Sequence, residues 1–237
     1  MAEWEDFGLS NFLSDHPELR LKKLSPEKLI LEGHYSINAQ MAGKNLVNET
    51  IRLRFEFDQK YPKEIPNVYD VDGLIPESAN YHINVGSGTL CLGSTLRVLG
   101  VINSAPSLKG FLENCVDPFL YSVFHKLRFG EFPYGELEHF EQGLIQDYEA
   151  LFGVSGKANV LLLLKALSLR KRLANKLICP CHCGQRLGRC NFRYRLGSWR
   201  VMAKRQWYRD HLNDDFTPIP KKKRKKARKN NKKSLVR

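Results

Sequence analysis

The chain has 237 residues, of which 42% are hydrophobic and 11% aromatic, enough for one ordinary domain and a smaller one. Its net charge of +13 is uneven: residues 1–155 contain 13 Lys and Arg against 22 Asp and Glu, residues 156–220 contain 14 against 3, and residues 221–237 contain 11 against none. No apolar run is long enough for a membrane span and the acidic N-terminus is unlike a secretory signal, so we expect a cytoplasmic protein with no membrane association.

The break in charge predicts the domain organisation. We expect a first domain over 1–155, a linking helix over 156–178, a basic cysteine-rich segment over 179–215 and a disordered basic tail over 216–237. The six cysteines divide in the same way, because four of them lie between residues 179 and 190. Such crowding favours a metal site in a reducing compartment over disulfide bridges.

The first part of the chain predicts a helix followed by antiparallel strands. Apolar residues at helical spacing over 4–21 indicate an amphipathic helix that is interrupted near Pro17. Residues 28–38 and 48–58 read as two strands of a hairpin, the second with strict alternation of apolar and polar residues. Two prolines precede a short strand over 67–71, and glycine-rich loops follow as far as Gly93.

Helical patterns return in the second half. The segment 107–127 begins with a plausible N-cap, Ser107, and carries Pro118, which we expect to kink or split the helix. A second helix over 134–153 carries one apolar stripe, and a third over 158–177 leads into the cysteines. The stripe consists of Leu137, Phe140, Leu144, Tyr148 and Leu151. Helix, strands, long loop and then helices predict an α+β fold.

Four features of the first 155 residues, in this order, resemble the ubiquitin-conjugating enzyme family, and the bacterial relatives of that family most closely. A helix precedes a meander of strands, and "YPKEIPNV" (61–68) is similar to the family's tyrosine-proline segment. "HIN" (82–84) is similar to its histidine-proline-asparagine motif, with Ile83 in place of the proline. "GTLCLG" (88–93) is similar to its catalytic-cysteine signature, although Asn84 lies one residue closer to the cysteine than is usual.

The resemblance implies a ubiquitin-conjugating-like fold and an acyl (aminoacyl) transferase. Cys91 would accept the C-terminus of a ubiquitin-like modifier as a thioester from an activating, adenylating enzyme and pass it to an amine on an acceptor protein. Asn84 would donate to the oxyanion or order the loop, and its ordinary alternative is a turn residue bonded to its own backbone. His82 would be structural. The glycines near Cys91 lack the pattern of a phosphate loop, so we expect no organic cofactor.

Two other readings of Cys91 stay open. His82 can act as a base for Cys91 in a Cys-His hydrolase. The substitution at Ile83 and the position of Asn84 also fit an inactive conjugating-like scaffold, whose basic rear segment binds nucleic acid or a protein partner. Cys115, on the apolar stripe of its helix, is expected to be core.

The rear cysteine cluster predicts a structural zinc site. "CPCHCGQRLGRCN" (179–191) resembles the zinc-binding tail motif of the bacterial preprotein translocase motor, with Asn191 at that motif's last ligand position. Thiolates and imidazoles are the ligands of structural zinc, but cysteines spaced two apart are awkward for one ion, so the ligand set stays open. The candidates are Cys179, Cys181, Cys183, Cys190 and His182.

Basic residues and aromatics alternate around and after the cluster, from Arg186 to Arg209. Such a pattern suits phosphate contact with base stacking, and it equally suits docking on an acidic protein surface.

Overall fold

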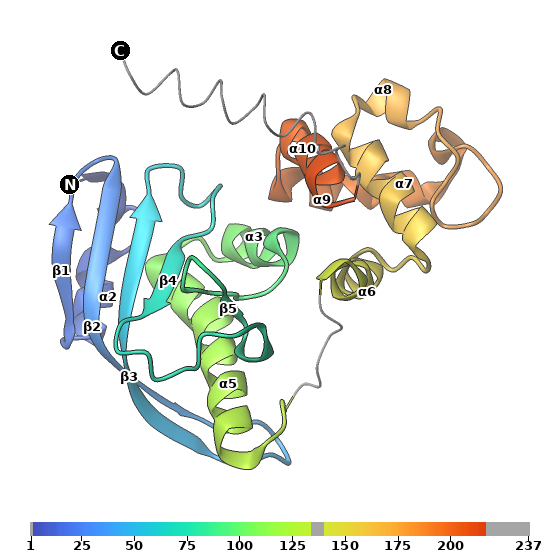
Figure 1. Ribbon diagram of the computed structural model, residues 1–237. Helices are drawn as coiled ribbons and strands as arrows, with labels where there is room; N and C mark the ends of the chain where they lie inside the picture. The colour runs from blue at the N-terminus through green and yellow to red at the C-terminus, as the bar shows by residue number, and fades with distance from the viewer. Residues whose placement is uncertain (1, 134–139, 217–237) are drawn as a thin grey trace. The chain divides into compact units, whose positions relative to one another are not determined.

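The computed structural model describes residues 2–133 and 140–216, which belong to two compact units divided between residues 136 and 137 (Figure 1). The first unit combines a sheet with helices, so the predicted α+β class is confirmed. The described part of the second unit is built from helices and the cysteine loop, and it includes the helix over 140–152, which precedes the predicted boundary at 155. Apart from Phe216, the tail predicted to be disordered lies outside the described residues.

A six-stranded sheet with the order β1-β2-β3-β4-β6-β5 forms the centre of the first unit. Among the described residues, neighbouring strands of the sheet pair antiparallel, and the longest ladder joins β2 to β3 from Lys28↔Asp58 to Ala39↔Val47. The strands are β1 (Leu19–Leu24), β2 (Lys28–Ala39), β3 (Val47–Asp58), β4 (Asn67–Asp70), β5 (Ile83–Asn84) and β6 (Thr89–Leu90).

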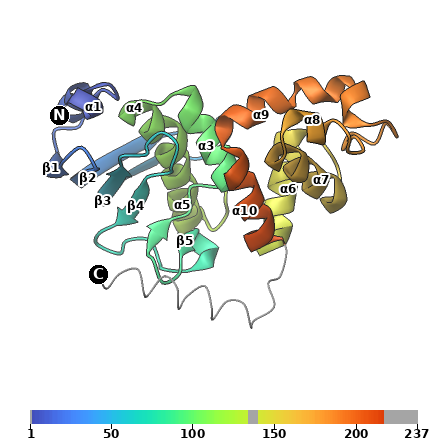
Figure 2. The same cartoon turned by 90° about the horizontal axis from the view of Figure 1, so that it is seen from above.

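The alternating sequence of β3 produces a sheet with one apolar face, as predicted. Ile51, Leu53, Phe55 and Phe57 are all buried, whereas the residues between them are only half-buried. The core also takes in the helices of this unit, and α5 packs on β2 and β3 on one side of the sheet (Figures 1 and 2). These helices are α1 (Ala2–Glu5), α2 (Leu9–Asp15), α3 (Thr95–Ser104), α4 (Leu108–Phe111) and α5 (Asp117–Phe129).

The structure departs from the predicted elements at two places, at the start of the chain and after Cys91. The helix expected over 4–21 ends at Asp15, close to the predicted interruption near Pro17, but the chain then enters β1, an edge strand in which only Leu19 is buried and which was not predicted. A strand with one buried residue lacks the alternation that marks strands in a sequence. Helix α3 was not predicted, and its Ser94 N-cap position and buried Leu96 and Leu99 are the signals that were missed.

Ser107 caps its helix as predicted, since its Oγ accepts a hydrogen bond from the Gly110 N–H (2.9 Å). Pro118 does not split the helix. A π-helical turn, η2 (Leu112–Val116), links α4 to α5 just before the proline. Pro118 has no N–H and its ring crowds the preceding turn, and a π turn is a common way to absorb such a mismatch.

In the second unit, α7 contacts each of the other helices (Figure 2). Its Val160, Leu163, Leu164 and Leu167 are completely buried. The helix expected to continue to Leu177 instead ends at Ser168 and resumes as α8, and α9 and α10 were not predicted. The five helices are α6 (Phe140–Phe152), α7 (Lys157–Ser168), α8 (Lys171–Ala174), α9 (Leu196–Met202) and α10 (Arg205–Asp215).

The apolar stripe predicted for α6 is confirmed only in part. Tyr148 is completely buried, but Leu144 and Leu151 are half-buried, and Ile145 and Phe152 take the buried positions beside Tyr148. Leu137 and the side chain of Phe140, the other two members of the predicted stripe, lie outside the described residues. Among residues 2–133 and 140–216, no single helix is long and apolar enough to cross a membrane, and only α6 and α7 taken together, bent by 67°, reach that length and composition.

Candidate functional site

The segment around Cys91 is a short hairpin at the end of the sheet. Strands β5 and β6 pair through Ile83↔Leu90 and Asn84↔Thr89, and β6 joins the main sheet through Tyr69↔Thr89. Gly86 and Gly88 have positive φ (87° and 68°) in the turn between them, a conformation that glycine adopts at little cost. The hairpin is therefore a local structure that the two glycines permit.

Cys91 follows β6 directly and is half-buried. Its N–H donates to the carbonyl oxygen of His82 (2.7 Å), which continues the hairpin by one pair. Leu90 on one side is buried, and Leu92 on the other packs partly against the core. The thiol therefore sits on an anchored backbone while part of the residue reaches solvent.

His82 lies directly across the hairpin from Cys91 through the backbone. It has a left-handed conformation (φ 54°) at the end of η1 (Ala79–Tyr81), and its ring contacts the Phe132 ring with centroids 5.1 Å apart. Lys126 of α5 donates to the Asn80 carbonyl (2.9 Å) and lies over the Phe132 ring. These contacts hold the loop before Cys91 against the end of α5.

Asn84 is exposed, and its amide is already engaged. Its side-chain Nδ2 donates to Thr89 Oγ1 (3.0 Å), and its backbone carbonyl oxygen accepts from the Gly88 N–H (2.9 Å). Asn84 is paired with Thr89, which lies two residues before Cys91 in the chain. The described contacts of Asn84 therefore stabilise the hairpin. The Nδ2 group has two hydrogens, so an oxyanion role for Asn84 requires either the second hydrogen or release of the first from Thr89.

Cys115 is buried on the helix that crosses the sheet, as predicted. Burial raises the pKa of its thiol to about 11, so it stays protonated at neutral pH. Of the two cysteines in the first unit, Cys91 is the one with solvent access.

The four rear cysteines come together in the second unit. Their sulfur atoms all lie within 4.8 Å of one another, with 3.2 Å between Cys179 and Cys181 and 3.6 Å between Cys181 and Cys190. Four thiolates at 2.3 Å from a tetrahedral ion would be about 3.8 Å apart. The four cysteines can therefore hold one metal ion, although three of them are spaced only two residues apart.

Backbone hydrogen bonds close the loop that carries these cysteines. The Cys179 N–H donates to the Gln185 carbonyl (2.8 Å), and Ile178 and Arg186 form an antiparallel bridge. His182 and Gly184, both with positive φ, turn the chain between these contacts. With the chain turned in this way, the sulfur atoms on either side of His182 lie within 4.8 Å of the other two.

Each of the four sulfur atoms also accepts a hydrogen bond from the backbone N–H two residues further along. Such donors favour the thiolate, which is the form that binds a metal, although burial holds the pKa of the Cys179 thiol above its ordinary value. Burial opposes ionisation of Cys181, but hydrogen bonds from the Cys179 thiol and the Cys183 N–H outweigh it and lower the pKa of this thiol to about 7. The four donors are the N–H groups of Cys181, Cys183, Gln185 and Phe192.

His182, the fifth predicted ligand, is not in the cluster. Its Nε2 forms a hydrogen bond with Nδ2 of Asn159, a buried residue of α7. Nothing in the sequence indicates this partner, since Asn159 is one of several polar residues in a mainly apolar helix. The contact ties the cysteine loop to α7.

The aromatic residues among the rear arginines divide into two groups. Trp199 and Tyr208 are buried, and the Tyr208 hydroxyl donates to the Trp199 carbonyl, so both belong to the core of the unit. Tyr194 is 67% exposed. The predicted alternation of basic and aromatic residues is thus partly a core pattern.

No family model matches the chain, and no curated protein or solved structure is detectably similar to it.

Proposed function

We propose that the chain is a ubiquitin-conjugating-like carrier, in which Cys91 holds the C-terminus of a ubiquitin-like modifier as a thioester. The observation that carries this proposal is the half-buried thiol on an anchored hairpin, between the buried Leu90 and Leu92, which packs against the core. Support also comes from the order of elements, with N-terminal helices, an antiparallel meander, a long loop that contains the cysteine, and then helices. This order is the one that the resemblance implies.

The chemistry needs only a thiol in two exchange steps. The Cys91 thiolate attacks the carbonyl carbon of the modifier's thioester with the activating enzyme, an S–C bond forms, and the enzyme's thiolate leaves. An amine of the acceptor then attacks the same carbon, the amide forms, and the Cys91 thiol is released. A partly exposed site suits this role because a bulky protein must reach the sulfur atom.

In this proposal, His82 and Asn84 position the thiol. The His82 carbonyl fixes the Cys91 backbone, and the Asn84 amide orders the hairpin through Thr89. The contact between the His82 ring and Phe132 favours this structural role over that of a base in a Cys-His hydrolase.

We further propose that the four-cysteine cluster binds zinc as a structural ion. The sulfur spacing and the four backbone donors suit a closed tetrahedral site, since structural zinc takes four nitrogen or sulfur ligands. The ion would stabilise the cysteine loop and the turns around it.

The carrier proposal is tested with a chemically activated acyl donor, because the modifier is unidentified. The full chain is incubated with a short peptide that ends in Gly-Gly as a mercaptoethanesulfonate thioester, and the adduct is located by peptide mass spectrometry. We expect a thiol-cleavable adduct on Cys91. In Cys91→Ala, we expect no adduct on the digest fragment that contains residue 91. Cys91→Ser should give an adduct that resists thiols, because an oxygen ester replaces the thioester.

Cys115→Ser is the matched control and should acylate like the parent chain, because Cys115 is buried. An adduct that persists unchanged in Cys91→Ala would reject Cys91 as the nucleophile. The inactive-scaffold reading would then be favoured.

A further inference from the structure

The second unit contains a long stretch of positive charge without acidic residues. Residues 157–209 include 14 Lys and Arg and no Asp or Glu. Thirteen of these 14 cations are in exposed residues of the described part of the chain, and Arg200 is the remaining one. Lys157 pairs with Glu141, and Arg200 is half-buried with a hydrogen bond to the Ala166 carbonyl (3.0 Å). The stretch as a whole therefore presents uncompensated positive charge.

The cysteine loop gathers part of this charge in one place. Gly188 lies against Asn175, since its N–H donates to the Asn175 carbonyl (3.0 Å) and a Cβ on Gly188 would come within 2.9 Å of the Asn175 Cβ. This contact brings the end of α8 beside the chain segment 186–194. We call the exposed residues at this junction the knuckle patch: Lys176, Arg186, Arg189, Arg193 and Tyr194.

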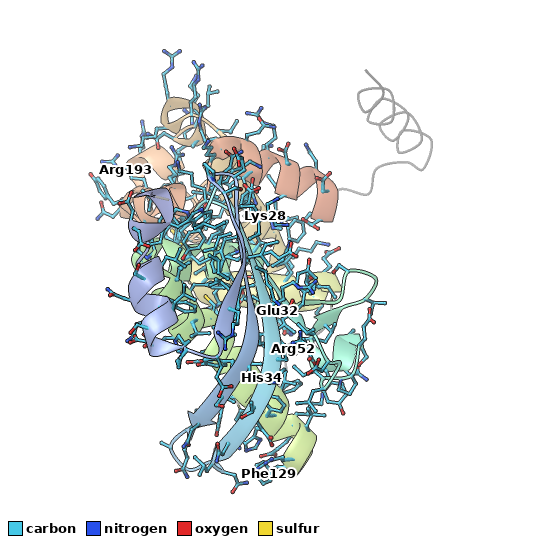
Figure 3. The ribbon with its side chains drawn as sticks, turned by 90° about the vertical axis from the view of Figure 1, so that its left-hand side faces the viewer. Lys28, Glu32, His34, Arg52, Phe129 and Arg193 are labelled. Carbon is cyan, nitrogen blue, oxygen red and sulfur yellow. The ribbon has the colours of Figure 1, made fainter. Side chains whose placement is uncertain are left out.

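Contacts with Arg193 fix the position of the Tyr194 side chain in this patch. The Arg193 guanidinium lies over its ring, 4.7 Å from the centroid, and donates to its hydroxyl (2.6 Å). Arg193, labelled in Figure 3, also donates to the Gly188 carbonyl, so both side chains are tied to the loop backbone. An aromatic ring that stays 67% exposed in such a fixed position contributes nothing to the core.

We propose that the knuckle patch binds single-stranded nucleic acid, with its cations on phosphates and Tyr194 against a base. Guanidinium groups match phosphate geometry with paired donors, and exposed aromatic rings stack on unpaired bases. An acidic protein segment would use the cations but leaves Tyr194 without a role. This activity is separate from thioester formation at Cys91.

The proposal is tested by fluorescence anisotropy with a labelled oligouridylate of about 20 nucleotides, long enough for one site. The full chain is compared with Tyr194→Ala and with the triple variant Arg186→Gln, Arg189→Gln, Arg193→Gln. Tyr194→Ala should weaken binding roughly tenfold, and Tyr194→Phe should restore it, because stacking needs the ring alone. The triple variant should flatten the slope of log affinity against log salt by about 2, since each lost phosphate contact removes about 0.7.

A matched triple variant in the first unit controls for net charge and for the basic tail. Arg20, Lys23 and Lys63 are exposed, and their change to Gln alters the charge by the same amount. This control should bind with the affinity of the parent chain. Equal losses in the two triple variants, or an unchanged affinity in Tyr194→Ala with its metal content intact, would overturn the proposal. Competition by poly-glutamate as effective as by RNA would overturn it in favour of an acidic protein partner.

Discussion

The two cysteines of the first unit differ in their exposure to solvent. Cys91 and Cys115 are both free cysteines, yet one is half-buried in a hairpin and the other is buried in a helix. The sequence predicted this difference correctly, because Cys115 falls on an apolar helical stripe and Cys91 lies among glycines. It did not predict that the Asn84 amide binds Thr89, which depends on the register of the hairpin.

We expect an alkylating agent to separate these two thiols. Iodoacetamide at neutral pH should modify Cys91 and leave Cys115 unmodified in the folded chain, because burial raises the pKa of Cys115 to about 11. Peptide mass spectrometry after brief labelling measures both sites. Equal labelling in the native chain would contradict the burial assigned to Cys115.

Glu32 is a buried carboxylate on the strand β2. Arg52 and Arg54 of β3 donate to its two oxygens (2.6 Å and 2.8 Å), and the three residues lie on the β2–β3 ladder with His34 beside Arg52 (Figure 3). The hydrogen bond from Arg54 is the main cause that lowers the pKa of Glu32 below its ordinary value. The ionised form is therefore the one that the fold prefers.

Glu32→Gln should destabilise the first unit by about 1–3 kcal/mol at neutral pH, the usual effect of losing hydrogen bonds to a charged group. A carboxyl with a lowered pKa contributes stability above its unfolded pKa, and that contribution is lost as pH falls through the folded value. The difference between Glu32→Gln and the parent chain should thus shrink in acid, as measured by urea unfolding at several pH values. Glu56→Gln, at a more exposed pair with Lys28, is the control and should cost less.

At the scale of elements, periodic patterns were predicted well and irregular ones were not. Strand β3 was found because its apolar and polar residues alternate, and β2 was predicted as its hairpin partner, whereas the edge strand β1 has one buried residue and no period. The cysteine loop shows the same limit. Its cysteines were identified, but the left-handed conformation of His182 and its hydrogen bond with Asn159 have no signature in the residue types.

Zinc binding gives a prediction for this loop. The purified chain should contain about one zinc ion per molecule, measured by elemental analysis, because four thiolates complete a tetrahedral site. Cys190→Ser should lose most of the metal, and a chelator should lower the melting temperature. His182→Ala, whose side chain faces Asn159, should keep its zinc. Loss of zinc in His182→Ala with Cys190→Ser unaffected would contradict the ligand set.

At the scale of the whole molecule, the sequence predicted two regions from charge, and the structure divides the chain into two compact units. The second unit was taken for a linking helix and a small basic segment. Its core was missed because Trp199 and Tyr208 were read as a surface pattern, although both are buried. Only tertiary contacts separate these residues from the exposed Tyr194.

Within the second unit, a partly buried chain of polar contacts joins α6 to α10. The Tyr148 hydroxyl and His211 Nε2 are 2.7 Å apart, and His211 Nδ1 is 2.6 Å from Asp215. Burial lowers the pKa of His211 despite Asp215, so the fold prefers the neutral ring. The unfolded chain then binds more protons in mild acid, and stability falls as pH drops below about 6.5.

We expect His211→Gln to flatten the pH dependence of stability in this range, because the glutamine side chain does not titrate. Thermal unfolding of parent and variant between neutral and mildly acidic pH measures the change. The variant should also be less stable at neutral pH by about 1–2 kcal/mol, since Tyr148 loses its buried partner. An unchanged pH dependence would show that His211 is not the titrating group.

The most direct test of the carrier role is the fate of a preformed Cys91 thioester. The Gly-Gly peptide adduct is isolated, and its decay is followed by mass spectrometry in buffer alone and with added lysine. A carrier predicts slow loss in buffer and faster loss with lysine, with the peptide transferred to the amine. Rapid hydrolysis that lysine does not change and that His82→Ala abolishes would contradict the carrier role and identify a Cys-His hydrolase.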